Sequence, residues 1–160
     1  MIRAERPGDE DAIRDVTTRA FAGAAHSDGT EADIVARLRD AGALTLSLVA
    51  DDGGIVVHVA FSPVTIVGAA GWFGLGPVSV APDRQQQGIG QKLILEGLAR
   101  LKTRGAAGCV VLGDPDYYAR FGFAADPALR YPGPPPAYFQ CLAFAGATPA
   151  GIVAYHSAFG

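Results

Sequence analysis

The stretch Gln85-Gln86-Gln87-Gly88-Ile89-Gly90-Gln91-Lys92-Leu93 places a glycine-punctuated turn directly before an amphipathic helix. The spacing of apolar residues after the turn predicts a helix from Ile89 to Arg104, with an apolar face made by Ile89, Leu93, Ile94, Leu98 and Leu101. Gly105 follows as a C-terminal cap, and Lys102 and Arg104 suit the negative end of the helix dipole. The turn therefore leads into the amino-terminal end of a strongly predicted helix.

The free N–H groups at that helix end, next to two glycines without a Cβ, form a place where an anion can contact the backbone. A P-loop is excluded, because no Lys-Ser or Lys-Thr pair follows the second glycine. A dinucleotide fingerprint is disfavoured, because Leu93 stands where its third glycine would be. A phosphate-holding loop and an ordinary strand-to-helix turn both remain open for the segment from Gln85 to Gly90.

The flanking segments favour a site over a plain turn. The preceding strand, Gly74 to Pro82, contains Pro77, which cannot donate a ladder hydrogen bond and belongs at an edge or a bulge. The following run, Cys109 to Leu112, is apolar throughout, as in a strand covered on both faces. Strand, helix and strand form a right-handed βαβ unit with two parallel strands. A bulge at Pro77 would splay this pair and leave a slot for a thin ligand.

The order Gln/Arg-x-x-Gly-x-Gly/Ala, with Gln85, Gly88 and Gly90 in its fixed places, resembles the acyl-CoA pyrophosphate loop of the GNAT N-acetyltransferase superfamily. The resemblance implies acetyl-CoA as cosubstrate and no metal. Its pantetheine arm would pair with backbone groups near Val78 and Val80. Its pyrophosphate would lie on the loop residues Gln85, Gln86, Gln87, Gly88, Ile89, Gly90 and Gln91.

The segment Asp116 to Phe123 is similar to the Tyr-x-x-x-Gly-Phe segment of the same superfamily. Tyr118 takes the position of the usual general acid, which would protonate the departing CoA thiolate. The asparagine often found earlier in this segment is missing, with Val111 at the matching distance, so its side-chain contact has no counterpart in this chain. The alternative role for Tyr118 is a packed aromatic residue beside Phe121 and Phe123.

The remaining elements follow from the period of the apolar residues. Helical spacing predicts helices from Asp9 to Phe21 and from Thr30 to Ala41. Alternation and turn residues predict strands at the following positions: 2–5, 44–48, 55–67 with an interruption at Pro63, 138–144 and 151–157, the last two as an antiparallel pair. A proline-rich loop, Tyr131 to Pro136, precedes that pair.

This order, βααβββαβαββ, is that of the GNAT fold: an α/β (α+β) protein with a central mixed, mostly antiparallel, twisted sheet of six to seven strands. The sheet would contain one splayed parallel pair and be flanked by about four helices. The segments 58–64 and 155–159 further resemble the branch of small bacterial proteins known as YhbS-like predicted acetyltransferases.

Composition narrows the class of partner. With 160 residues and no internal repeat or linker, the chain is expected to form a single GNAT domain over 1–160. A net charge of −3 gives no basic footprint for nucleic acid, and no apolar run is long enough for a membrane span. We therefore expect a cytoplasmic protein, monomeric or homodimeric, with Cys109 and Cys141 as reduced core thiols.

The reaction implied by the resemblance is direct attack of a primary amine, on a small molecule or a peptide, on the thioester of acetyl-CoA. An amine with a pKa near 10.4 must lose a proton before it attacks, which calls for a general base. Glu31 is the first candidate, with Asp33, His26 and His58 as alternatives; Glu31 also fits a helix-dipole acid and His58 a structural histidine. A non-catalytic acyl-CoA-binding module is the rival function, and nicotinamide redox chemistry is a weaker one.

Overall fold

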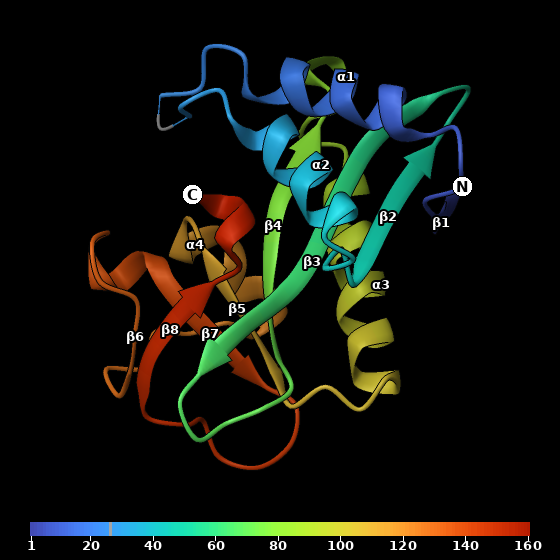
Figure 1. The fold of residues 1–160 in the computed structure, drawn as a ribbon. Helices are drawn as coiled ribbons and strands as arrows, with labels where there is room; N and C mark the ends of the chain where they lie inside the picture. Colours follow the sequence, from blue (N-terminus) through green and yellow to red (C-terminus); the bar gives the residue numbers. More distant parts are fainter. Residues whose placement is uncertain (26) are drawn as a thin grey trace.

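The computed structural model describes residues 1–25 and 27–160 and is built around one eight-stranded sheet (Figure 1). Six strands lie in the order β1-β2-β3-β4-β5-β7, while β8 pairs with β3 and β6 pairs with β8. The strands are β1 (Ile2–Ala4), β2 (Leu46–Asp51), β3 (Ile55–Ile66), β4 (Trp72–Val80), β5 (Gly108–Leu112), β6 (Leu129–Arg130), β7 (Phe139–Ala143) and β8 (Gly151–Tyr155). Among the strands of the described residues, only β4–β5 and β6–β8 are parallel, which confirms a mixed, mostly antiparallel sheet.

Strands β4 and β5 splay apart as the proline in the sequence predicts. Their parallel register ends at the pair Leu75↔Val111. On the other edge of β4 the register with β3 shifts where Gly76 and Pro77 form an extra step between Leu75 and Val78. Beyond this irregularity, Val78 to Val80 pair with β3 only. The outer edge of β4 is therefore open beside the end of β5.

In residues 1–25 and 27–160, four α-helices surround the sheet. Helices α1 (Glu10–Phe21) and α2 (Glu31–Asp40) lie together across one face, and α3 (Ile89–Thr103) covers the other, as Figure 1 shows. The short α4 (Pro115–Tyr118) follows β5. Side chains alternate between the two faces of the sheet along β3: Phe61 joins the core beneath α3, whereas His58 points to the side of α1 and α2.

Helix α3 packs very close to the sheet because Gly97 faces β3. A Cβ at Gly97 would overlap the ring of Phe61, which is itself fully buried. The core below this contact contains the apolar face predicted from the sequence, with Leu93, Ile94, Leu98 and Leu101 buried. This close contact places the first turn of α3 at the open edge of β4.

Two predictions about strands are wrong. The last two long strands do not pair with each other: β7 pairs with β5, and β8 pairs with the end of β3 from Val64 to Ile66. Strand β3 also runs through Pro63 without a break. Pro63 lies in the gap between the residues of β3 that pair with β2 and those that pair with β8, so its missing N–H interrupts neither ladder.

Two features that bear on function are absent from the described residues. None of the helices in 1–25 and 27–160 is long and apolar enough to cross a membrane. Within the same residues, no group of three or more His, Cys, Asp and Glu side chains is arranged to hold a metal ion.

Candidate active site

A cavity of about 560 Å³ opens where α3 begins, at the free edge of β4. We call it the loop cavity. It brings together every residue that the sequence assigns to the cosubstrate, together with Tyr118. Its lining consists of Ala20, Phe21, Val78, Val80, Arg84, Gln85, Gln86, Gln87, Gly88, Ile89, Gly90, Gln91, Tyr117, Tyr118 and Arg120.

The turn before α3 adopts a conformation that exposes backbone donors. Gln86 has φ 63°, and Gly88, the residue that caps the helix, has φ 80° and no side-chain capping bond. The first backbone bond of the helix comes from Lys92 N–H to Gly88 C=O at 3.2 Å. The N–H groups of Ile89, Gly90 and Gln91 therefore lack an acceptor within the helix and add their partial positive charge to the cavity.

Gly90 allows the helix start to approach β4. A Cβ at this position would lie 3.2 Å from Cγ2 of Val80 and 4.0 Å from the hydroxyl of Tyr117. The contact with Val80 would press on a residue that lines the cavity, whereas that with Tyr117 is an ordinary van der Waals contact. The second glycine of the sequence motif thus has a packing role, whereas the first, Gly88, has a conformational one.

Two arginines border the loop cavity. Arg120 donates from Nε to the carbonyl of Tyr117 at 2.7 Å, and its guanidinium lies 4.4 Å from the centre of that tyrosine ring. Arg84 forms an ion pair with Asp52 at 2.6 Å. The sequence motifs did not identify these two arginines, Tyr117 or Phe21 as site residues. A cavity assembled from separate elements has no signature in the spacing of one segment.

Tyr118 lies at the wall between the loop cavity and a second one. Asp114 begins the short helix α4 by accepting a hydrogen bond from Asp116 N–H at 2.9 Å. The Tyr118 ring then packs over Gly113, where a Cβ would lie 2.5 Å from ring atom Cε2. Burial, with a smaller contribution from Tyr117 and Asp114, raises the pKa of Tyr118 to about 12. Its phenol is therefore protonated at neutral pH.

The second cavity, about 370 Å³, adjoins the first and shares Phe21, Val78 and Tyr118 with it. We call it the aromatic cavity. Its walls come from α1, α2, β4, β5, β8 and the C-terminal segment. Its lining consists of Phe21, Glu31, Ile34, Leu75, Gly76, Pro77, Val78, Leu112, Tyr118, Tyr131, Tyr155 and Phe159.

Glu31 is the charged side chain of this lining. It is the first residue of α2, and its Oε1 accepts a hydrogen bond from Ser27 Oγ at 2.7 Å. The carboxylate is partly exposed and close to the helix N-terminus, where a negative charge is stabilised. The structure thus places Glu31 and Tyr118 in one cavity, although 86 positions separate them in the chain.

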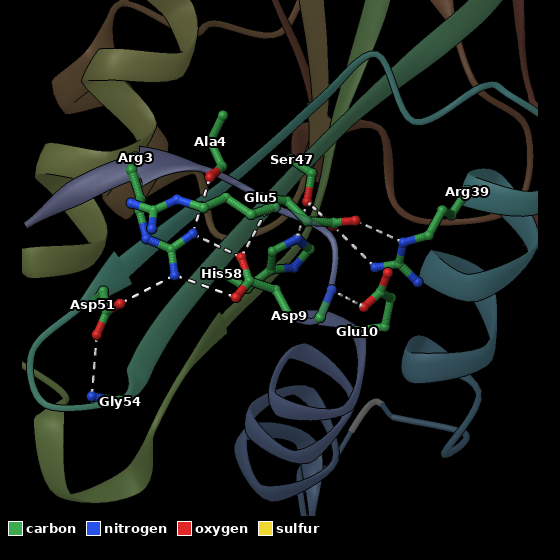
Figure 2. A network of polar contacts seen from close by, with 12 residues as sticks. Arg3, Ala4, Glu5, Asp9, Glu10, Arg39, Ser47, Asp51, Gly54 and His58 are labelled. Carbon is green, nitrogen blue, oxygen red and sulfur yellow. Dashed lines mark hydrogen bonds and ion pairs between the residues drawn. The ribbon is translucent and has the colours of Figure 1, made fainter.

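The other candidate bases lie elsewhere or cannot be placed. Asp33 forms an exposed ion pair with Arg14 at 3.1 Å and lines neither cavity. His26 lies outside the described residues. His58 is fully buried and belongs to a polar network shown in Figure 2.

The contacts in that network account for the buried position of His58, and none of them requires a catalytic role. His58 Nε2 lies 2.8 Å from Ser47 Oγ, which donates to Glu5, and Arg39 binds the same carboxylate at 2.8 and 2.9 Å. Burial, with a smaller contribution from Arg39, lowers the pKa of His58 to about 4. His58 is thus a neutral structural residue beneath α1 and α2.

Comparison with known proteins identifies one protein family. The model of the acetyltransferase (GNAT) domain matches residues 44–125, which include the loop, β4, β5 and Tyr118. An uncharacterized N-acetyltransferase of Escherichia coli strain K12, YhbS, is 40% identical over 99% of this chain and 98% of its own length.

Two solved structures of GNAT family acetyltransferases are also similar to this chain. A GNAT family acetyltransferase from Brucella melitensis in complex with acetyl-CoA has a TM-score of 0.90 and 57% identity, with 100% of this chain and 97% of that chain covered. The crystal structure of E. coli YhbS in complex with CoA has a TM-score of 0.90 and 38% identity, with 99% and 91% covered.

Proposed function

Because the chain belongs to the GNAT acetyltransferase family, we propose that it transfers the acetyl group of acetyl-CoA to a primary amine. The observation that carries the proposal is the convergence of two features in the loop cavity. The unpaired N–H groups at the start of α3 and the phenol of Tyr118 line the same space. The N–H groups suit a diphosphate, and the phenol suits a leaving thiolate.

The cosubstrate would bind along the line from the loop to Tyr118. Its pyrophosphate would lie on the backbone of Gln85 to Gln91, and its pantetheine arm would pair with the open edge of β4 at Val78 and Val80. The acetyl-CoA bound to the Brucella melitensis relative supports this choice of ligand. Arg84 and Arg120 would add positive charge at the rim of the cavity.

The aromatic cavity would receive the amine, with Glu31 as general base. The carboxylate would take a proton from the ammonium form of the acceptor, directly or through water. The neutral nitrogen would then attack the thioester carbonyl, forming the C–N bond as the C–S bond breaks. Tyr118 would hydrogen-bond or protonate the departing sulfur, giving an N-acetyl product and free CoA. The nitrogen gives up two protons in all: the first passes to Glu31 and from there to solvent, and the second, lost after attack, replaces the one that Tyr118 gives to the thiolate.

We also propose that residues 1–160 act as one catalytic domain. Strands from Ile2 to Tyr155 belong to one sheet, and the aromatic cavity takes Phe21 from α1 and Phe159 from the C-terminal segment. Removal of either end would therefore open the acceptor side of the site.

Calorimetric titration and thiol release together test the proposed function. We expect acetyl-CoA and CoA to bind and NAD not to bind, and at least one primary amine to release thiol in the presence of acetyl-CoA. A tertiary amine of the same shape is the matched control, because it has no N–H to lose and gives no amide. Binding of acetyl-CoA without thiol release from any primary amine would favour an acyl-CoA-binding module instead.

A further inference from the structure

The aromatic cavity has a composition that selects among amines. Five of its twelve lining residues are aromatic, and the remaining apolar ones include Ile34, Leu75 and Leu112. Among the residues that the structure describes, Glu31 is its single charged side chain. A cavity of this kind offers one place for a cation and a large apolar surface for the rest of a ligand.

The aromatic rings form a continuous wall. Tyr131 meets Tyr155 edge to face, with ring centres 5.1 Å apart, and Tyr155 meets Phe159 at 5.2 Å. The Tyr155 ring is fixed from behind, since a Cβ at Gly74 would lie 2.7 Å from its Cε1. A planar apolar body can stack on such a wall, and a cationic nitrogen nearby gains from the ring faces.

The same lining disfavours three other kinds of acceptor. A polyamine or an aminoglycoside would bring several ammonium groups into a cavity with one carboxylate, and each unpaired charge would lose its hydration. A free amino acid would place its own carboxylate beside Glu31. A sugar carries more hydroxyl groups than the tyrosines and Glu31 of this lining can pair, which leaves the others against apolar walls.

We infer that the acceptor is a small monoamine with an aromatic or compact apolar body, held by stacking on Tyr131, Tyr155 and Phe159, with its ammonium group at Glu31. This inference rests on the proposed function, because it names the substrate class of the same site. The volume agrees: a dry cavity of about 150 Å³ holds benzene, so 370 Å³ accommodates one or two rings with a short aminoalkyl arm.

Competition among amines at saturating acetyl-CoA tests the inference. We expect kcat/KM for phenethylamine and tryptamine to exceed that for spermidine and kanamycin by about tenfold or more. L-Phenylalanine differs from phenethylamine only by its carboxylate and should also be a poorer acceptor. A phenylalanyl peptide represents protein N-termini. A higher kcat/KM for spermidine, kanamycin or the peptide would overturn the inference while leaving acetyl transfer intact.

A charged residue added to the wall of the aromatic cavity gives a second test, in a variant that should still fold. Leu112 lines the aromatic cavity and is 42% exposed, so Leu112→Glu introduces a second carboxylate at little expense to the core. We expect the ratio of kcat/KM for phenethylamine to that for spermidine to fall by about tenfold. Leu95→Glu, at a 54% exposed position on α3 that lines neither cavity, is the matched control and should leave the ratio unchanged. An unchanged ratio in Leu112→Glu would contradict the inference.

Failure of the inference and failure of the proposed function are distinguishable by calorimetry. Phenethylamine titrated into the chain saturated with CoA reports the cavity without any reaction. Binding that is weakened by Leu112→Gln, together with no thiol release, would support the apolar monoamine site and contradict acetyl transfer. Absence of phenethylamine binding would overturn the inference, whatever the outcome of the acetyl-CoA titration.

Discussion

Tyr118 illustrates how the position of one residue combines two requirements. Its ring must be packed well enough to hold the hydroxyl in place, and Gly113 provides room for that packing. The same burial raises its pKa to about 12, which keeps the phenol protonated and able to donate at neutral pH. A more acidic group at this position would lose its proton before the thiolate formed.

We expect Tyr118→Phe to lower kcat by roughly 10² to 10⁴, because the departing thiolate loses its hydrogen-bond donor while the aromatic packing is kept. The Kd for acetyl-CoA should change little. Steady-state thiol release and calorimetry measure the two quantities. Tyr138→Phe is the control: Tyr138 is 48% exposed and lines neither cavity. An unchanged kcat with chemistry as the slow step would exclude Tyr118 as the acid.

Site residues were predictable to different degrees. Tyr118 and the loop residues could be proposed because each belongs to a short motif with fixed spacing. Phe21 belongs to no motif, and the segment 155–159 that contains Phe159 indicated a branch of the superfamily but no place in the site. Both residues enter the aromatic cavity because α1 and the C-terminal segment meet beside β4. The proposed acceptor side of the site is therefore assembled by tertiary structure, and local sequence does not indicate which residues line it.

At the scale of elements, helix α3 and its preceding loop form one working unit. The first turn of α3 supplies the unpaired N–H groups, and the close contact of Gly97 with Phe61 fixes their position relative to β4. The two glycines at the ends of α3, Gly88 and Gly105, both have left-handed backbones and open space around them. They therefore provide a matched pair for experiment.

We expect Gly88→Ala to raise the Kd for acetyl-CoA about tenfold, because the side chain disfavours φ 80° and shifts the loop amides. Gly105→Ala carries a similar backbone penalty at φ 85°, about 1 kcal/mol in the free energy of unfolding, but lies at the far end of the helix. Urea denaturation and calorimetry separate the two effects. An equal Kd in both variants would argue against phosphate binding at the loop.

The elements themselves divide into those that local pattern specifies and those that it does not. Helix α3 was predicted from 89 to 104 and runs from Ile89 to Thr103, because its apolar period and capping residues are all local. The pairing of β7 with β5, and of β8 with β3, is a long-range choice. Neighbouring strands in sequence usually pair, so the sequence favoured a terminal hairpin. The two-residue β6 is too short for any alternation to indicate it.

At the scale of the whole molecule, the buried polar network in Figure 2 connects the N-terminal segment, α2, β2 and β3 through Glu5, Arg39, Ser47 and His58. His58 must be neutral in this setting, since burial lowers its pKa from 6.5 to about 4. The unfolded chain binds a proton at that residue more readily than the folded one between these values. Stability should therefore rise with pH across this window.

We expect the free energy of unfolding to fall by about 2 kcal/mol between pH 7 and pH 5 through His58 alone, at about 1.36 kcal/mol for each pKa unit. The contribution is fully present above pH 6.5 and is lost as the pH approaches 4. His58→Gln, which has no proton to bind, should show a shallower fall over the same range. Urea denaturation at several pH values measures both chains, and parallel profiles would contradict the role of His58.

The loop cavity and the aromatic cavity share one wall, which is made by Phe21, Val78 and Tyr118. Under the proposed function, a bound nucleotide would complete the surface that the amine meets, and the amine would in turn hold the nucleotide. Linkage makes such an effect reciprocal: the factor by which the nucleotide raises the affinity for the amine equals the factor by which the amine raises the affinity for the nucleotide. Under the proposed function, a search for the natural acceptor should therefore be made on the nucleotide-loaded form.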